Sequence, residues 1–392
     1  MNVIIYENKI LDSLKPFMVN HSPLELRIGA FTNFERIKNL FNDEDKLFII
    51  VRKDIEGLIK DKFPTYDVNP DTVPEGICLN SSAIFMDTDI DLIKKKQNLS
   101  TSNQLISFYL NKKISLIDFY DVVNDKSEIT IESNIKIINN MWDIFDMPEQ
   151  ILENDYKEFL FTNNYNWHHS LIKINEDKVF IGNNCTLKAG VILDASIGPI
   201  IIDENVTIEH HVSIKGPVYI GKGSLVSSGS KIKENTIIGP VCKVGGEISH
   251  CNFLGYSNKV HEGFLGHSYV GEWVNIGAGT NNSNLKNNYS NIRIIIDSKE
   301  YDTQKQFLGT LIGDYTRIAI GTVINTGTYI SIGSNIFNHE FSCKYMPAFS
   351  WGLNERVIFN KFIDSILKMK NRRNKKITLA EMDFLETLYK NI

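Results

Sequence analysis

A six-residue repeat runs through the second half of the chain and limits its fold more than any other feature. A helix or a simple strand meander does not account for a long-range period of six. In a solenoid, each hexapeptide supplies one short strand and one corner, and the aliphatic side chains stack inward. The repeat therefore predicts a three-sided β-helix over residues 178–346. Its aliphatic positions are Ile202, Ile208, Ile214, Ile220, Val226, Ile232, Ile238, Val244, Val270, Ile276, Ile312, Ile318, Ile324, Ile330 and Ile336.

Two interruptions divide this repeat, one between Ser249 and Leu265 and one across residues 281–306. Insertions in a solenoid leave the scaffold as loops, and loops on a rigid scaffold often carry function. The glycine-rich stretch "VNIGAGT" lies between the two interruptions, at residues 274–280. We therefore expect loops at both breaks and a functional site close to them.

The rest of the chain has a different pattern. Short aliphatic runs at 3–6 and 47–51 alternate with helical spacing at 53–63, which predicts an α/β domain over residues 1–135. Residues 136–177 are expected to form a helical linker, with Pro148 in the first turn of a helix. Residues 347–392 are expected to form a C-terminal helical cap, in which Thr378 and Glu381 stand at capping-box spacing. These helices would cover the open end of the solenoid or dock on a neighbouring subunit.

The composition argues against nucleic-acid-binding and membrane-spanning proteins. The net charge of −5 gives no general reason to bind nucleic acid, and no apolar run is long enough to cross a membrane. The first residues lack an export signal and the five cysteines are scattered, so we expect a cytoplasmic protein. Residues 368–376, "KMKNRRNKK", contain six basic residues. This segment is either a solvated loop between helices or an anion-binding segment that contacts the phosphates of coenzyme A.

Four motifs carry a resemblance to a known family. They are "PLELRIGAF" at 23–31, "MWDIF" at 141–145, "PAFSWG" at 347–352 and "GYSNKVHEGFLGHSYVGEWVNIGAGTNNSNLKNNY" at 255–289. The last of these resembles the acetyltransferase half of the bifunctional N-acetylglucosamine-1-phosphate uridylyltransferase and glucosamine-1-phosphate N-acetyltransferase. The whole chain is similar to a divergent bacterial version of that enzyme. The resemblance implies a left-handed β-helix that assembles as a homotrimer, with acyl-transfer sites between neighbouring solenoids.

The resemblance also implies a set of site residues. His261 falls on the catalytic histidine, which takes a proton from the attacking amine, and acetyl-CoA is the implied acyl donor. Phe264 replaces the family's tyrosine, and Ser249 and His250 stand where the family carries adjacent lysines. His267, six residues after His261, would stack close to this pocket. The implied substrate-binding residues are Asn275, Asn284, Phe264, Lys259, Lys243 and Tyr289, and the implied residues for the cofactor are Gly277, Gly279 and Thr280.

The first domain carries fewer signals. The glycine-rich phosphate loop of the better-known nucleotidyltransferases is missing, and His21 stands where the divergent family commonly has an arginine. Arg27 and Lys15 are the candidates to bind a nucleoside triphosphate, and Asp87 or Asp89 is the candidate to hold Mg²⁺ if nucleotidyl transfer occurs. An ion pair between Arg27 and Glu25 is the structural alternative. No metal site is assigned from the sequence.

The sequence therefore leaves three functional hypotheses. The leading one is a sugar-phosphate transferase that acetylates an amino sugar 1-phosphate in the β-helix and couples this step to formation of a nucleotide sugar. The second keeps only the acyl transfer, with a degenerate nucleotide-binding domain. The third is a trimeric scaffold without catalysis.

Overall fold

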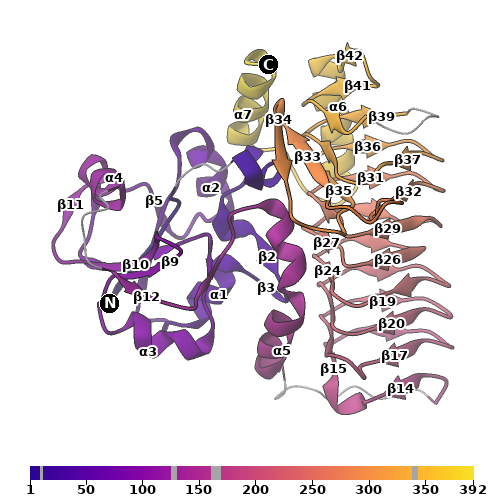
Figure 1. Cartoon of the computed structure of the whole chain (residues 1–392), viewed down its shortest axis with the longest axis horizontal. Helices are drawn as coiled ribbons and strands as arrows, with labels where there is room; N and C mark the ends of the chain where they lie inside the picture. The colour runs from indigo at the N-terminus through magenta and orange to yellow at the C-terminus, as the bar shows by residue number, and fades with distance from the viewer. Residues whose placement is uncertain (9–11, 125–129, 160–168, 338–342) are drawn as a thin grey trace.

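Two domains lie side by side in the computed structural model, which describes residues 1–8, 12–124, 130–159, 169–337 and 343–392. Figure 1 shows the α/β domain next to one side of a tall solenoid, with helix α5 (Pro148–Phe159) between them. Among the helices formed by these residues, none combines the length and the apolar character that a membrane crossing requires.

The first domain is built on a mixed, seven-stranded sheet with the strand order β12-β9-β10-β7-β1-β4-β5. Strands β7, β4 and β5 belong to its parallel part around β1, whereas β10 runs antiparallel to β7 and β9. The strands are β1 Asn2–Tyr6, β4 Lys46–Ile50, β5 Asp67–Val68, β7 Gly76–Asn80, β9 Leu99–Thr101, β10 Gln104–Leu110 and β12 Ile131–Glu132. The helices are α1 Asn33–Asn39, α2 Glu56–Lys62, α3 Ile90–Ile93 and α4 Leu116–Asn124. Short strand pairs complete the domain: β2 Arg27–Ile28 with β3 Phe31–Thr32, β6 Thr72–Val73 with β11 Ile114–Ser115, and β8 Ala83–Ile84 with β13 Lys136–Ile137.

The solenoid has three sheets, each forming one side of a coil, and nearly all of their strand pairs are parallel. Side 1 contains β14 Ile172–Ile174, β17 Ile192–Asp194, β20 Ser213–Lys215, β23 Lys231–Ile232, β26 Glu247–Ser249 and β29 Phe264–Gly266. Side 2 contains β15 Val179–Ile181, β18 Ile200–Ile202, β21 Val218–Ile220, β24 Thr236–Ile238, β27 Asn252–Phe253, β30 Tyr269–Val270, β35 Thr310–Ile312, β38 Thr328–Ile330 and β40 Tyr345–Met346. Side 3 contains β16 Thr186–Leu187, β19 Thr207–Ile208, β22 Leu225–Val226, β25 Lys243–Val244, β28 Asn258–Lys259, β31 Asn275–Ile276, β36 Arg317–Ile318, β39 Asn335–Ile336, β41 Ser350–Trp351 and β42 Glu355–Arg356.

The inward aliphatic columns confirm the predicted repeat. Every aliphatic residue of the hexapeptide series belongs to one buried cluster that fills the interior of the coils. The expectation of a loop at the first interruption was wrong, because β27, β28 and β29 continue the three sides there. The inward positions shift to Ile248, Phe253, Lys259 and Leu265, and the register of the repeat changes while the coil goes on.

The second interruption does leave the solenoid. After β32 (Asn281–Asn282) the chain forms the hairpin of β33 (Arg293–Ile296) and β34 (Lys299–Asp302), and it returns at β35. Strand β32 pairs with β37 (Val323–Ile324) rather than with the strands of side 1. Ile292, Ile294 and Ile296 pack their side chains into a buried cluster together with residues of the first domain. The insertion therefore helps to hold the two domains together.

Side 2 of the solenoid is apolar on its outer face as well, and this explains where the first domain sits. Phe180, Ile201 and Tyr219 face outward there and pack against Leu152 and Tyr156 of α5. Higher on the same side, the outward residues Tyr269, Leu311 and Tyr329 share a buried cluster with Phe17 and Trp142. Because a sheet that is apolar on both faces must be covered on both faces, the first domain lies over this side.

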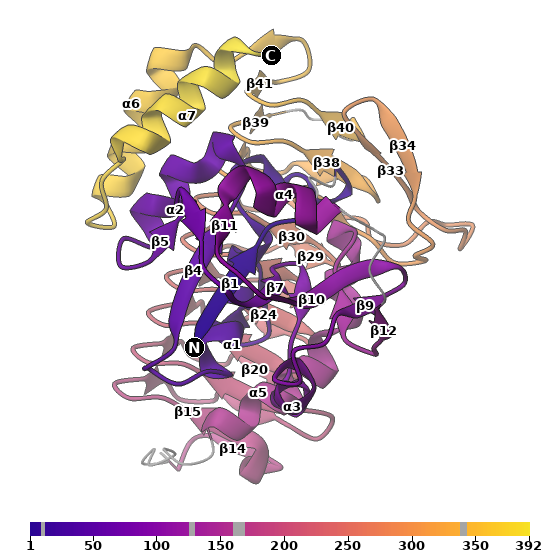
Figure 2. The same ribbon diagram turned by 90° about the vertical axis from the view of Figure 1, so that its left-hand side faces the viewer.

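The C-terminal helices pack along one corner of the solenoid. Helix α6 (Phe359–Asn371) and helix α7 (Leu379–Lys390) lie next to each other in Figure 2, and their apolar residues surround Trp273, Tyr315 and Phe349. Thr378 caps α7 by accepting a hydrogen bond from the Glu381 backbone N–H, as its spacing predicted. Helix α7 also contacts α2, so the cap touches both domains.

The fold class predicted from the sequence is confirmed: an α/β domain, a hexapeptide β-helix and C-terminal helices. The sheets of the solenoid begin at β14 and end at β42, and so extend beyond residues 178 and 346 on both sides. The linker contains a 3-10 helix at Met141–Asp146 followed by α5, which begins at Pro148. Residues 160–168 of the predicted linker lie outside the described residues.

Candidate active-site cleft

The outer face of side 3 carries a column of polar side chains. Lys243, Asn258, Asn275 and Arg317 each directly precede an inward residue and occupy equivalent positions in successive coils. Since alternate residues of a strand face opposite sides, all four side chains project outward. The six-residue register thus aligns two amides and two cations on one surface.

This surface forms the floor of a cleft of about 820 Å³. Helix α6 and the turn after it supply the opposite wall through Ser365, Lys368, Met369, Arg372 and Arg373. The guanidinium of Arg373 donates a hydrogen bond to Oδ1 of Asn258 at 2.9 Å, which fixes the wall to the floor. His261 lies at the corner after β28, is exposed, and lines the same cleft.

The cleft is lined by six basic side chains and by no carboxylate of the described residues: Lys243, His261, Arg317, Lys368, Arg372 and Arg373. A concave surface with charge of a single sign concentrates ligands of opposite charge. Lys368, Met369, Arg372 and Arg373 belong to the basic segment 368–376, so the structure favours the anion-binding interpretation of that segment.

Lys259 lies inside the coil rather than in the cleft. Its side chain occupies an inward position between Val244 and Ile276 and is 1% exposed. The ammonium donates hydrogen bonds to the carbonyl oxygens of Gly245 at 3.1 Å and His261 at 2.9 Å. Burial lowers the pKa of Lys259 to about 8, and the nearby Glu262 carboxylate opposes this effect. The residue contacts the backbone of His261 directly.

Phe264 and Asn284 lie away from the cleft, at the edge of side 1. The amide of Asn284 is 2.9 Å from Nδ1 of His267, whose ring stacks on the His250 ring with centroids 4.4 Å apart. Burial and the neighbouring His250 lower the pKa of His267 to about 3. A Cβ at Gly266 would lie within 3 Å of both the Phe264 ring and the Asn284 amide, so this position needs a glycine. His267 therefore stacks here and does not line the cleft with His261.

The remaining predicted residues of the solenoid occupy three settings. Gly277 lines the cleft beside Asn275. Gly279 is an exposed corner glycine with φ of +71°, and buried Thr280 donates a hydrogen bond to the Ala319 carbonyl oxygen. Tyr289 is exposed in the insertion. The structure thus brings His261, Lys243, Asn275 and Gly277 together in one cleft and separates the others from it.

The three nucleotide-binding candidates of the first domain also lie in different settings. Arg27 is buried against the solenoid, where its guanidinium lies over the Tyr219 ring and donates hydrogen bonds to Ala30 and Glu35. Lys15 pairs with Asp12 and with Asp297 of the insertion. Their role in binding a nucleotide stays a prediction.

Asp87 is exposed at the start of a 3-10 helix. Within the part of the chain that the structure describes, it does not belong to a group of three side chains close enough to share a metal ion. The predicted Mg²⁺ therefore has no assigned set of ligands around Asp87. The alternative ion pair of Arg27 with Glu25 is replaced by one with Glu35, while Glu25 pairs with Lys62 and His21.

Sequence reasoning missed Arg317 and the cleft wall. Arg317 directly precedes the inward Ile318, so the hexapeptide register alone could have placed its side chain on the face of Asn275. The insertion separates the two residues by 42 positions in the chain, which hides their equivalence. The register gives no signal for Arg373, because α6 reaches the cleft only through tertiary packing.

The fold and the cleft define a two-domain protein that joins a nucleotidyltransferase-like α/β domain to a hexapeptide β-helix of the acyltransferase type. Residues 3–162 match the sugar nucleotidyl transferase family. The chain is 31% identical over 187 residues to the bifunctional protein GlmU of Baumannia cicadellinicola subsp. Homalodisca coagulata, a match that covers 45% of this chain and 36% of that protein. It is 26% identical over 150 residues to a bifunctional sugar-1-phosphate nucleotidylyltransferase/acetyltransferase of Sulfurisphaera tokodaii, covering 33% of this chain and 37% of that protein.

A solved structure of UDP-N-acetylglucosamine acyltransferase from Campylobacter jejuni aligns with 42% of this chain and 69% of that chain, at 15% identity and a TM-score of 0.26. The sequence matches confirm the resemblance: residues 3–162 match the sugar nucleotidyl transferase family, and the chain is similar to GlmU proteins. It spans about a third of the length of the curated relatives that it matches.

Proposed function

We propose that this protein is a sugar-phosphate transferase that transfers an acetyl group from acetyl-CoA to the amine of an amino sugar 1-phosphate in the cleft of His261. The observation that carries the proposal is the cleft itself, in which a histidine and two amide side chains lie among lysine and arginine side chains. Both substrates are phosphorylated, so this charge suits both of them.

The proposed reaction forms a nitrogen–carbon bond and breaks a carbon–sulfur bond. The lone pair of the sugar amine attacks the thioester carbonyl, and His261 takes the proton that the nitrogen loses. An imidazole can accept and release a proton in this pH range. The thiolate of coenzyme A leaves and takes up a proton. Asn275 would orient the sugar, while the backbone around Gly277 would follow the acyl donor.

Nucleotidyl transfer from a nucleoside triphosphate is the second proposed activity. The family match at residues 3–162 and the printed activity of the Sulfurisphaera tokodaii relative support it. The burial of Arg27 favours a different candidate, in which the protein is an acyltransferase only and its nucleotide-binding domain is degenerate. Incubating the protein with each nucleoside triphosphate and N-acetylated sugar 1-phosphate, while pyrophosphate is measured, distinguishes the two candidates.

We further propose that the active form is a homotrimer in the cytoplasm. The resemblance to GlmU-like proteins supports this assembly, and the separation of Asn284 and Phe264 from the His261 cleft is consistent with it. In a trimer, the edge of side 1 that carries these two residues would face the cleft of a neighbouring subunit.

Replacing His261 with Ala tests the acyl transfer. We expect the rate of coenzyme A release, with acetyl-CoA and glucosamine 1-phosphate as substrates, to fall by about 10² to 10⁴-fold, as for loss of a general base. His210 is another exposed histidine of the solenoid and lies outside the cleft, so His210→Ala is the matched control and should keep the wild-type rate. An unchanged rate in His261→Ala would refute the assignment.

A further inference from the structure

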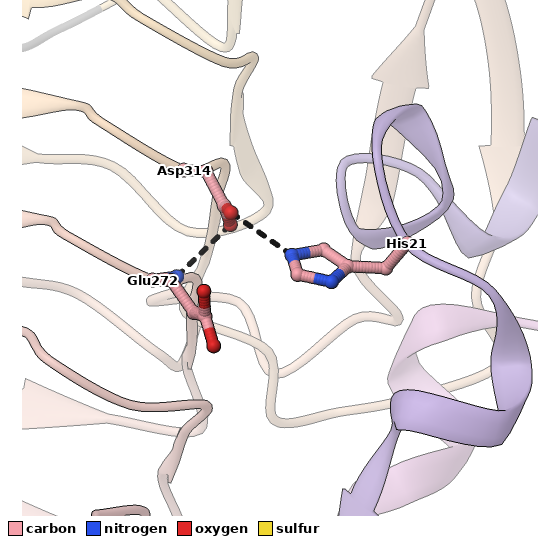
Figure 3. Close-up of side chains that lie close together, drawn as sticks. All are labelled: His21, Glu272 and Asp314. Atoms are coloured by element: carbon pink, nitrogen blue, oxygen red, sulfur yellow. Dashed lines mark hydrogen bonds and ion pairs between the residues drawn. The ribbon is translucent and has the colours of Figure 1, made fainter. Parts of the chain in front are cut away.

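A polar cluster joins the first domain to the solenoid, with His21 and Asp314 buried and Glu272 half-buried. His21 comes from the loop between two short 3-10 helices, whereas Glu272 and Asp314 come from corners of the solenoid (Figure 3). One ligand-type atom from each of these three side chains lies within 4.8 Å of the others.

The two carboxylates occupy the same place in adjacent coils. Val270 pairs with Ile312, and Glu272 and Asp314 each follow two residues later. Coils of a parallel sheet lie about 4.8 Å apart, so the two acidic side chains come from neighbouring positions, with Asp314 buried and Glu272 half-buried. Such a pair needs a cation between or beside its members.

The imidazole of His21 is held in the orientation of a metal ligand. Its Nε2 lies 2.9 Å from Oδ2 of Asp314, while Nδ1 lies 3.1 Å from Oε1 of Glu25 and 3.1 Å from the ammonium of Lys62. The ring stacks on Phe17 at 5.0 Å between centroids and is 1% exposed. A histidine that binds a metal through one nitrogen usually has its other nitrogen bonded to a carboxylate or carbonyl, as here.

Two polar groups of the cluster lack partners. Asn20 is 7% exposed and donates from Nδ2 to Asp314 at 2.9 Å, yet its Oδ1 is buried without a hydrogen bond. Among the residues that the structure describes, none forms a hydrogen bond or ion pair with the Glu272 carboxylate. Asn20 and Glu272 both line a cavity of about 150 Å³, which gives room for an ion to enter.

The charges of the cluster also call for a cation. Glu25, Glu272 and Asp314 supply three negative charges, and Lys62, which pairs with Glu25, supplies one positive charge. An imidazolium at His21, which lies between Asp314 and Glu25, adds a second positive charge, so the three carboxylates still exceed the two cations by one.

We propose that His21, Glu272 and Asp314 bind a divalent transition-metal ion, with Asn20 Oδ1 as an additional oxygen ligand. One imidazole with carboxylate oxygens is a ligand set that suits Zn²⁺. Because the ligands come from the first domain and from two coils, the ion fastens the two domains to each other. The site is independent of the acyl-transfer proposal.

Titration of the full chain with Co²⁺, after treatment with a chelator, tests this site. We expect one equivalent to bind, and X-ray absorption at the cobalt edge should report one imidazole among oxygen ligands. Asp314→Asn should weaken binding at least tenfold. The matched control is Glu381→Gln, which changes another carboxylate of the same cavity outside the ligand set and should bind within twofold of wild type.

Absence of stoichiometric binding to the wild-type chain would overturn the proposal. Equal binding by Asp314→Asn, or an absorption spectrum that reports several imidazoles or sulfur, would also overturn it. If Asp314→Asn does not fold, the spectrum of the wild-type protein decides alone, because only His21 can supply a single imidazole in this cluster.

Discussion

Lys259 is a charged residue in an aliphatic column. Its neighbours in the column, Val244 and Ile276, are both part of the apolar interior, and the ammonium is satisfied only by two backbone carbonyls. One of these carbonyls belongs to His261. We interpret Lys259 as a positioning residue that fixes the corner from which the His261 side chain enters the cleft.

Replacing Lys259 with Met should therefore raise the stability of the protein and lower its activity. The pKa of about 8 lies below the ordinary lysine value of 10.5, so burial of the charge costs about 3 kcal/mol below pH 8. Removing the charge therefore stabilises the folded protein, and the loss of two hydrogen bonds to carbonyls offsets part of this stabilisation. We expect Lys259→Met to raise the free energy of unfolding by about 1–2 kcal/mol at pH 7, measured by urea denaturation, while the acetyl-transfer rate falls.

The pH dependence of this difference follows from the sign of the shift. Between pH 8 and 10.5 the unfolded chain binds more protons at Lys259 than the folded protein, so the wild type gains stability as pH rises through this window. The advantage of the Met variant should shrink accordingly. Lys243→Met, on the outer face of the neighbouring strand, should not show this dependence. A constant difference across the window would contradict the buried charge.

At the scale of elements, α6 converts one side of the solenoid into a cleft. Lys368 and Arg372 project from this helix and the turn after it toward the polar face of side 3. They have no equivalent in the hexapeptide repeat, because the repeat only supplies the floor. The affinity of the cleft for anionic substrates is therefore a property of helix docking.

The double variant Lys368→Ala/Arg372→Ala should raise the KM for acetyl-CoA about tenfold or more with little change in kcat, since two charge-assisted contacts are lost. The salt dependence of the KM should weaken at the same time. Steady-state kinetics at two salt concentrations measure both effects. Lys361→Ala, on an exposed position of the same helix outside the cleft, serves as the control. An unchanged KM in the double variant would show that the wall does not bind this substrate.

At the scale of the whole molecule, buried side chains from both domains form one continuous junction. Arg36 of the first domain and Asp155 of α5 form a buried ion pair, in which Nη2 lies 3.0 Å from Oδ2, and Asp155 also accepts a hydrogen bond from the Ala30 backbone N–H. Together with the apolar cluster beneath the insertion, this pair couples the domains. We expect them to unfold in one transition.

Asp155→Asn should lower the free energy of unfolding by about 3–5 kcal/mol, because it leaves the buried Arg36 without a counter-charge. Glu153 lies on the same helix and forms an exposed ion pair with Lys178, so Glu153→Gln should cost less than about 1 kcal/mol. Differential scanning calorimetry measures both. Two separate transitions in the wild-type protein, or equal effects of the two variants, would contradict a tightly coupled junction.

The hexapeptide register determined by itself the solenoid and the outward direction of Lys243 and Asn275, because the spacing along a strand sets the side on which each residue lies. The same register predicts that Arg317 faces outward as well, although the insertion hides its equivalence to Asn275. The motif around His261 marked the corner that lines the cleft. These features depend on local geometry, and local geometry follows directly from residue order.

Only the tertiary structure decided what covers each side of the solenoid. The burial of Arg27, the cleft wall from α6 and the cluster of His21 with Glu272 and Asp314 all join segments far apart in the chain. Such contacts depend on which apolar outer faces meet, and that choice minimises exposed apolar area over the whole molecule rather than within any single repeat.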